Sequence, residues 1–280
     1  MGVLAYLGPK GTNSEEAAIY MAQLLAKEEI VLSPTNTIDE AIKLVYDKKV
    51  DYCLVPVENS IEGSVRITLD TLAHDVDLMV ESELIWSVHN HLLIKNPNAR
   101  IHTIISHGQP LAQCREYLRK YYSEAKIESV ESTAKAAQIC RELDGVAAIA
   151  TKSAAKIYGL TVIDEDIQDI EDNFTRFILL TRKDKAKKNI SKQRQNMMII
   201  CQIDGRAGSL YELLGDFAKR KVNMTRIESR PARTSLGEYI FFIEIDASAK
   251  KSDINEALNA IKEKCLWLKN LGAFPVIKAQ

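Results

Sequence analysis

The chain has 280 residues, of which 46% are hydrophobic and 27% are charged, enough for two ordinary globular domains with cores of their own. Its 37 Lys and Arg nearly balance its 38 Asp and Glu, leaving a net charge of -1, so no overall field favours nucleic acid or an anionic membrane. No apolar run reaches the ~18 residues of a membrane span, and the first residues resemble no signal peptide. We therefore expect a cytoplasmic protein.

The cysteines lie far apart and form no C-x-x-C motif. This pattern favours free thiols over a disulfide framework or a zinc site. The five residues are Cys53, Cys114, Cys140, Cys201 and Cys265.

Up to about residue 183, short apolar runs alternate with helix-like segments, which is typical of a parallel or mixed sheet with helices on its faces. The expected strands are 3–7, 29–32, 52–57, 101–106, 126–130, 146–150 and 174–180. The expected helices are 14–26, 38–46, 67–73, 110–121, 134–143 and 153–158.

The segment 184–196 is almost wholly polar and basic, and we expect a solvated linker there. A nucleic-acid-binding arm is the weaker reading, because no aromatic residues are interleaved with the charges. The following order is strand 197–203, helix 208–219, strands 223–229 and 239–246, helix 253–262 and strand 266–271. This βαββαβ order predicts a ferredoxin-like second domain over 197–280.

Three loops lead from a strand into a polar or helical segment and carry groups suited to a small anion. The first, Gly8-Pro9-Lys10-Gly11-Thr12, opens a helix whose N–H groups suit a carboxylate, but it lacks both nucleotide-binding glycine patterns. The second loop holds Glu58, Asn59, Ser60, Gly63 and Ser64, and the third runs from Ser106 to Gln113. A capped turn without a ligand explains any one loop alone.

The segment from Asp172 to Phe177 places an acid, an amide, a hydroxyl and a guanidinium at the start of a strand that otherwise reads as buried. Each such group would cost free energy if it were buried without a partner. We therefore expect a ligand site at this strand end.

Two histidines, His89 and His91, lie two residues apart on a strand-like stretch. A metal site would need a third ligand in register, so a structural role is favoured. His107 adjoins the third loop and is a weaker candidate for ligand contact than Gln113.

Together these motifs resemble the prephenate dehydratase family, in its monofunctional form with a C-terminal ACT domain. The matching stretches are Gly8-Pro9-Lys10-Gly11-Thr12, residues 56–63, Ser106-His107 with Gln113-Cys114, Glu131-Ser132-Thr133 and residues 172–177. The resemblance implies a two-lobed, periplasmic-binding-protein-like α/β catalytic domain over 1–183. It also implies a hydro-lyase that converts prephenate into phenylpyruvate for phenylalanine biosynthesis, without metal or cofactor.

The resemblance also implies the roles of individual side chains. Thr175 would donate a proton to the departing ring hydroxyl, and strand alternation places Arg176 on the opposite face, bracing Asp172 or a loop. An ionised Glu beside the substrate dianion would need a proton or a cation. The expected catalytic residues are Thr175, Asn59, Ser64, Gln113 and Glu58. The expected substrate-binding residues are Thr12, Ser60, Gly63, Ser106, Glu131, Asn173, Phe174 and Arg176.

In the ACT domain, the resemblance implies feedback by L-phenylalanine, often at a subunit interface, in a homodimer or homotetramer. The expected effector residues are Gly208, Ser209, Leu210, Asn223, Glu228, Ser229, Arg230 and Pro231. Asn13, Gly108 and Ser209 depart from the usual family residues. Two alternatives stay open, an arogenate dehydratase and a non-catalytic amino-acid sensor.

Overall fold

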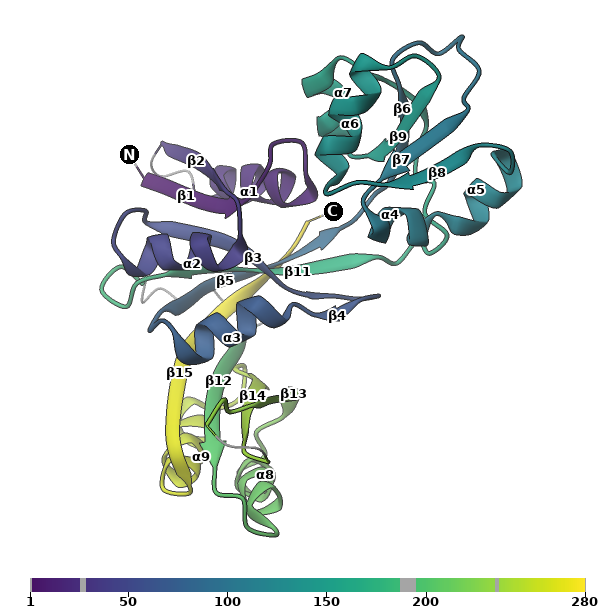
Figure 1. The fold of residues 1–280 in the computed structure, drawn as a ribbon. Coiled ribbons are helices and arrows are strands. Elements are labelled where there is room, and N and C mark those ends of the chain that lie inside the picture. Colours follow the sequence, from purple (N-terminus) through teal and green to yellow (C-terminus); the bar gives the residue numbers. More distant parts are fainter. Residues whose placement is uncertain (1, 26–28, 187–194, 235–236, 280) are drawn as a thin grey trace. The chain divides into compact units, whose positions relative to one another are not determined.

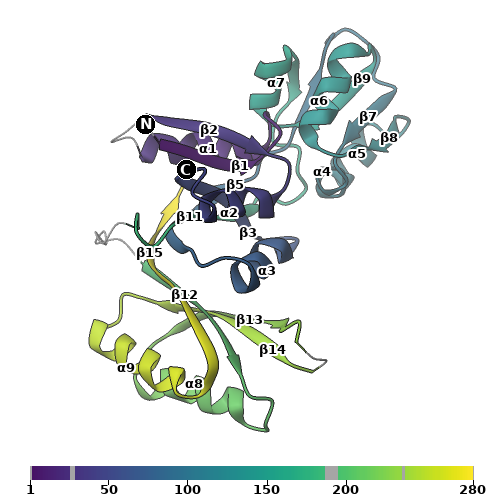
Figure 2. The ribbon, with the colours of Figure 1, turned by 60° about the vertical axis from the view of Figure 1, so that its left-hand side comes forward.

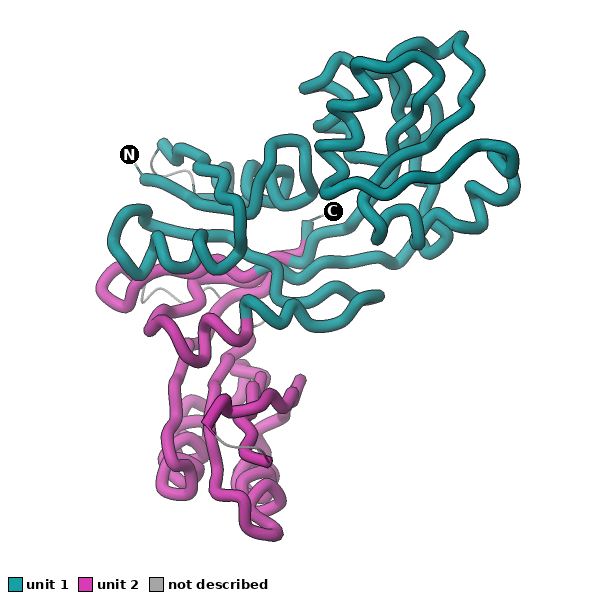
Figure 3. Tube along the Cα trace, in the orientation of Figure 1, with its two compact units in different colours: residues 1–68, 85–177, 279–280 teal, residues 69–84, 178–278 magenta. Residues whose placement is uncertain are grey.

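The computed structural model describes residues 2–25, 29–186, 195–234 and 237–279. They form two compact units, one of residues 1–68, 85–177 and 279–280 and the other of residues 69–84 and 178–278 (Figure 3). Three elements cross the boundary along the chain: α3 (Arg66–His74), β5 (Met79–Ser87) and β11 (Phe174–Thr181). No helix within the described ranges is long and apolar enough to cross a membrane.

Helices join neighbouring strands in the first sheet of unit 1 (Figure 1). Strand β1 (Gly2–Leu7) pairs in parallel with β2 (Ile30–Thr35) and β3 (Tyr52–Asn59). Helices α1 (Asn13–Leu24) and α2 (Ile38–Tyr46) connect these strands, and each begins where a threonine hydroxyl accepts a main-chain N–H, at Thr12 and Thr37. The mixed sheet with covering helices is therefore confirmed.

The second sheet of unit 1 has the order β10-β6-β9-β7-β8. The strands are β6 (His91–Ile94), β7 (Thr103–Ser106), β8 (Lys126–Ser129), β9 (Val146–Ala150) and β10 (Thr161–Asp164). The helices of this region are α4 (Gly108–Gln113), α5 (Arg115–Tyr121), α6 (Thr133–Glu142) and α7 (Lys152–Tyr158). Strand β9 is buried throughout, as its continuous apolar run predicts.

The structure adds strands that the sequence pattern did not predict, namely β5, β6, β10 and the two-residue β4 (Gly63–Ser64). The single helix expected over 110–121 is wrong, because the chain bends at Cys114 between α4 and α5. The Asp169 carboxylate accepts the N–H groups of Glu116 and Tyr117 at 2.9 and 3.1 Å, so α5 has a separate N-terminal cap.

Unit 2 contains the predicted βαββαβ arrangement. Its strands are β12 (Gln195–Ile203), β13 (Met224–Pro231), β14 (Tyr239–Asp246) and β15 (Cys265–Lys278), in the antiparallel order β13-β14-β12-β15. Helices α8 (Ser209–Lys219) and α9 (Lys251–Lys262) lie on one side of this sheet (Figure 2). Buried Leu213 and Phe217 of α8 and Ile261 of α9 pack on strand residues such as Ile199 and Ile243.

The expected linker over 184–196 includes residues 187–194, which lie outside the described residues. The compact units divide the chain differently from the expected domains, because residues 69–84 group with the C-terminal part. The domain limits 1–183, 184–196 and 197–280 stay predictions.

Candidate active site

A hydrogen-bonded set of side chains connects the end of β3 with the start of β11. The Asn59 side-chain nitrogen Nδ2 lies 2.9 Å from Asn173 Oδ1, 3.2 Å from the Phe174 carbonyl oxygen and 3.0 Å from Thr175 Oγ1. Asn59 is only 6% exposed and Asn173 is fully buried. The segment expected to form a site therefore meets the second loop in space.

The orientation of the Asn59 amide is fixed by its oxygen. Oδ1 accepts the main-chain N–H groups of Ile61 and Glu62, each at 3.0 Å. Only an oxygen can accept these hydrogens, so Nδ2 must be the atom that faces Thr175. Thr175 Oγ1 is therefore a hydrogen-bond acceptor toward Asn59. No acceptor for its own O–H lies within hydrogen-bond distance in the described part of the chain.

Ser60 ties the two strands together at the main chain. Its N–H donates to the Phe174 carbonyl at 2.8 Å, and its Oγ accepts the Phe174 N–H at 2.9 Å. The same hydroxyl donates to the Asp172 carbonyl at 3.3 Å. Ser60 and Phe174 thus hold Asn59 and Thr175 in position.

Gln113, at the end of α4, joins this set through Asn173. Asn173 Nδ2 donates to Gln113 Oε1 at 3.1 Å, and Asn90 Nδ2 donates to the same oxygen at 3.2 Å. Gln113 is 8% exposed, and its Nε2 has no hydrogen-bond partner among the described residues. The sequence analysis missed Asn90; its one signal was an amide between two histidines in an otherwise apolar stretch.

Glu58 and Arg176 lie on the other face of their strands. Arg176 Nη1 lies 2.6 Å from Glu58 Oε2, and both side chains are partly exposed. Ser64 pairs with Glu58 in the β3–β4 register, so it shares the face of Glu58 rather than that of Asn59. The structure therefore does not bring the expected catalytic residues Glu58 and Ser64 next to Thr175, and Gly63 lies on the same hairpin.

Three further expected residues lie outside this set of hydrogen bonds. Thr12 caps α1, and the buried Ser106 hydroxyl donates to the Ile149 carbonyl at 2.6 Å. Glu131 is exposed just before α6. Within the described ranges, none of these three residues makes a side-chain hydrogen bond to Asn59, Gln113 or Thr175.

The first loop instead docks against α7. Thr151 Oγ1 donates to the Gly11 carbonyl at 3.1 Å, and the Ser153 N–H donates to Glu16 Oε1 at 3.1 Å. Gly11 has a φ of +83°, and a side chain there would meet the Ala154 backbone at 3.3 Å. The glycine therefore permits a close approach between two parts of unit 1. Burial at this contact also raises the pKa of the Glu16 carboxyl.

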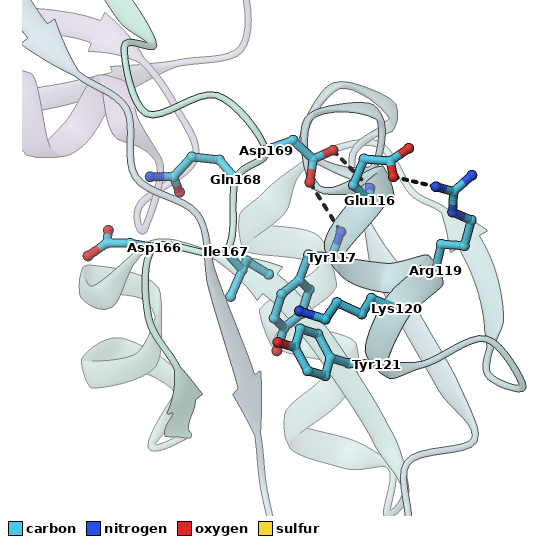
Figure 4. A pocket seen from close by; sticks show the side chains of 9 residues that line it. All are labelled: Glu116, Tyr117, Arg119, Lys120, Tyr121, Asp166, Ile167, Gln168 and Asp169. Carbon is cyan, nitrogen blue, oxygen red and sulfur yellow. Dashed lines mark hydrogen bonds and ion pairs between the residues drawn. The ribbon is translucent and has the colours of Figure 1, made fainter.

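Residues of α5 and of the segment 166–169 line a hollow of about 560 Å³ (Figure 4). Asp169, on its wall, caps α5 with its carboxylate while its own N–H donates to the Gln113 carbonyl at 2.7 Å. Tyr117 donates to Asp164 at 2.5 Å, and burial raises the pKa of the Tyr117 hydroxyl. The lining consists of Glu116, Tyr117, Arg119, Lys120, Tyr121, Asp166, Ile167, Gln168 and Asp169.

In unit 2, the predicted effector motif Gly208, Ser209 and Leu210 lines a hollow of about 380 Å³. The Ser209 hydroxyl donates to Asp204, and this hydrogen bond lowers the pKa of the Asp204 carboxyl. The other residues lining it include Arg206, Tyr211, Glu238 and Tyr239.

The second effector motif makes different contacts. Glu228 pairs with Arg226 at 2.6 Å, and Arg230 pairs with Asp70 of α3 at 2.9 Å. The residues Asn223, Glu228, Ser229, Arg230 and Pro231 are not among those lining the hollow. Of the two motifs, only the first lines it.

The histidines noted in the sequence do not form a metal site in the ranges that the structure describes. Those ranges contain no cluster of three or more His, Cys, Asp or Glu side chains able to hold a metal ion. His89 contacts Asp166 at 2.7 Å, and His91 Nδ1 accepts the Asp166 N–H at 3.1 Å.

Comparison with known proteins identifies both parts of the chain. Residues 4–185 match the family model "Prephenate dehydratase", and residues 197–263 match "ACT domain". A prephenate dehydratase of Methanocaldococcus jannaschii is 37% identical over 97% of this chain and 97% of its own length. A bifunctional chorismate mutase/prephenate dehydratase of Aquifex aeolicus is 35% identical over 97% of this chain and 73% of its own length.

A solved structure gives the same answer. The prephenate dehydratase of Arthrobacter aurescens in complex with L-Phe is 31% identical, with a TM-score of 0.86 over 98% of this chain and 90% of that chain. The chain described here belongs to the prephenate dehydratase family and carries a C-terminal ACT domain.

Proposed function

We propose that this chain removes water and carbon dioxide from prephenate to give phenylpyruvate, with Thr175 as the group that protonates the departing hydroxyl. The ring carboxylate leaves as carbon dioxide, and its bonding electrons complete the aromatic ring as the ring C–O bond breaks. The hydroxyl takes up one proton and leaves as water. Because aromatisation drives the reaction, the protein must mainly orient the dianion and assist the leaving hydroxyl.

The observation that carries this proposal is the 3.0 Å hydrogen bond from Asn59 Nδ2 to Thr175 Oγ1. Since this oxygen accepts from Asn59, its O–H hydrogen can point at the leaving group. The donated hydrogen bond also stabilises negative charge that develops on Oγ1 as the proton departs. Water then returns the proton to Thr175.

Two features of the site are compatible with an anionic substrate. Gln113 Nε2, which has no partner in the part of the chain that the structure describes, supplies N–H donors. A buried donor of this kind gains most from a carboxylate or hydroxyl oxygen. The carboxylate of Glu58 is paired with Arg176 on the other face, so it does not repel the dianion at close range.

The ACT unit gives a second part of the proposal. The hollow at Gly208, Ser209 and Leu210 would bind L-phenylalanine, the ligand of the related Arthrobacter aurescens structure. Such binding would couple to the active site by about 1 to 3 kcal/mol. A cytoplasmic homodimer or homotetramer belongs to the same proposal.

Product analysis tests this function. Purified chain is given prephenate or arogenate, and phenylpyruvate or phenylalanine is quantified with the released carbon dioxide. We expect phenylpyruvate from prephenate, with a higher kcat/KM than for arogenate. Preferential turnover of arogenate would identify an arogenate dehydratase, and no turnover of either by folded protein would contradict the proposal.

A further inference from the structure

We propose that Asn90 is a positioning residue, which holds the Gln113 amide so that its NH2 group, and not its oxygen, faces the substrate. The inference rests on the proposed function. It assigns a role to a side chain that lies outside the matching motifs and donates a hydrogen bond to Gln113.

Asn90 is 1% exposed and is held at its main chain. Its N–H donates to Gln168 Oε1 at 3.0 Å, and its carbonyl accepts the Ile167 N–H at 2.9 Å. Asp169, two residues after Ile167, donates its N–H to the Gln113 carbonyl. Figure 4 shows Gln168 and Asp169 extending to opposite sides of this segment. One short segment therefore fixes the main chains of Asn90 and Gln113 together.

The Gln113 oxygen receives two hydrogen bonds, from Asn90 Nδ2 at 3.2 Å and from Asn173 Nδ2 at 3.1 Å. Turning the amide over would set its NH2 group against two other NH2 groups, with no acceptor among them. Asn173 is itself fixed, because its Oδ1 accepts from Asn59. The side-chain amides thus form a directed chain that leaves Gln113 Nε2 as a donor.

A buried N–H group without a partner costs about 1 to 3 kcal/mol. In the described part of the chain, Gln113 Nε2 is buried without a partner while Gln113 Oε1 accepts two hydrogen bonds. This arrangement favours binding of a ligand oxygen to Nε2. Asn90 acts on the substrate only through Gln113, which distinguishes it from a residue that merely fills the core.

The isosteric variant Asn90→Asp tests the inference, because it replaces the donor by an acceptor. At pH 8 we expect kcat/KM for prephenate to fall about 10- to 100-fold, as for the loss of one oriented hydrogen bond. As the pH falls, the buried carboxyl takes up a proton and can donate again, so the ratio to wild type should rise. Asn98→Asp, in an exposed turn, is the matched control and should change kcat/KM less than twofold.

A double-mutant cycle separates positioning from packing. In a Gln113→Met background, Asn90→Asp should lower kcat/KM by less than about twofold, since the group it positions is gone. An undiminished effect in that background, or wild-type kcat/KM in the single variant, would overturn the inference.

A readout without turnover keeps this inference separate from the proposed function. The side-chain NH2 signals of Gln113 in ¹H–¹⁵N spectra are identified by their loss in Gln113→Met. We expect them to shift in Asn90→Asp and to stay in place in Asn98→Asp. Unshifted signals would overturn the positioning role, whereas a wild-type chain that makes no phenylpyruvate would contradict only the proposed function.

Discussion

Asn59 Nδ2 lies 3.0 Å from Thr175 Oγ1, and the two residues are 116 positions apart in the chain. The Asn59 oxygen is occupied by two main-chain N–H groups, so the amide can only donate to the threonine. This hydrogen bond uses one lone pair of Thr175 Oγ1 and leaves its O–H available to donate to a ligand beside it.

Asn59→Asp reverses this hydrogen bond while keeping the side-chain shape. The Thr175 O–H would then donate to the new carboxylate instead of the substrate, and we expect kcat to fall about 10²- to 10³-fold. Steady-state kinetics with prephenate give the value, and circular dichroism checks the fold. Wild-type kcat in a folded variant would exclude Asn59 from the mechanism.

We expect the Glu58–Arg176 ion pair to contribute to stability rather than to chemistry. Glu58→Gln and Arg176→Met should each lower the free energy of unfolding by about 1 to 3 kcal/mol. Urea denaturation of the single and double variants gives the coupling between the two residues. We expect turnover in Glu58→Gln to fall less than about tenfold, below the range typical for loss of a general acid or base. If Glu58→Gln lowered kcat as much as Asn59→Asp does, Glu58 would have to be counted among the catalytic residues.

The buried His91 predicts a pH dependence of stability. Burial lowers the pKa of its imidazole, with smaller effects from Asp166, Lys152, His89 and Glu165, and its Nδ1 already accepts a hydrogen bond. As the pH falls below about 6.5, the unfolded chain binds a proton at this site before the folded chain does, so the free energy of unfolding decreases.

The slope attributable to His91 is at most about 1.4 kcal/mol per pH unit. Thermal unfolding between pH 8 and 5 should show a smaller decrease in His91→Gln than in wild type, while the exposed-site control His102→Gln keeps the wild-type slope. An unchanged slope in His91→Gln would contradict the assignment.

Arg230 makes an ion pair within unit 2 that its motif did not indicate. Its guanidinium makes hydrogen bonds to both carboxylate oxygens of Asp70, and both side chains are largely buried. Arg230→Lys loses this two-point contact, and we expect a loss of about 1 to 3 kcal/mol in the free energy of unfolding.

Arg233 provides a matched control, because it contacts the same carboxylate through a more exposed side chain. Arg233→Lys should cost less than about 1 kcal/mol. Equal losses in the two variants would show that the geometry of Arg230 is unimportant.

The sequence predicted the elements that carry long apolar runs or strong helix caps, such as β1, β9 and α2. It missed the nine-residue β5 as well as β4, β6 and β10, which have two to four residues each and depend on their partner strands. The bend at Cys114 was also missed, because the cap of α5 comes from Asp169, 53 residues away from Glu116. Distant contacts of this kind leave no local pattern.

Only part of the candidate site could be predicted, because some of its contacts also join residues far apart in the chain. Motif order located Asn59, Gln113 and Thr175. In the structure Asn59 bonds directly to Thr175 and is linked to Gln113 through Asn173. Strand alternation separated Arg176 from Thr175, and the same rule applied to β3 would have separated Glu58 from Asn59. Asn90 could not be assigned from sequence, because its partner Gln113 is brought near only by tertiary packing.

Turnover of prephenate by Thr175→Val and Thr175→Ser tests the central claim most directly. Valine keeps the branched shape but removes the hydroxyl, and serine keeps the hydroxyl. We predict that Thr175→Val forms phenylpyruvate at least about 10²-fold more slowly than wild type, within the range for loss of a proton donor, while Thr175→Ser retains most of the activity. Turnover by folded Thr175→Val at the wild-type rate would contradict the account.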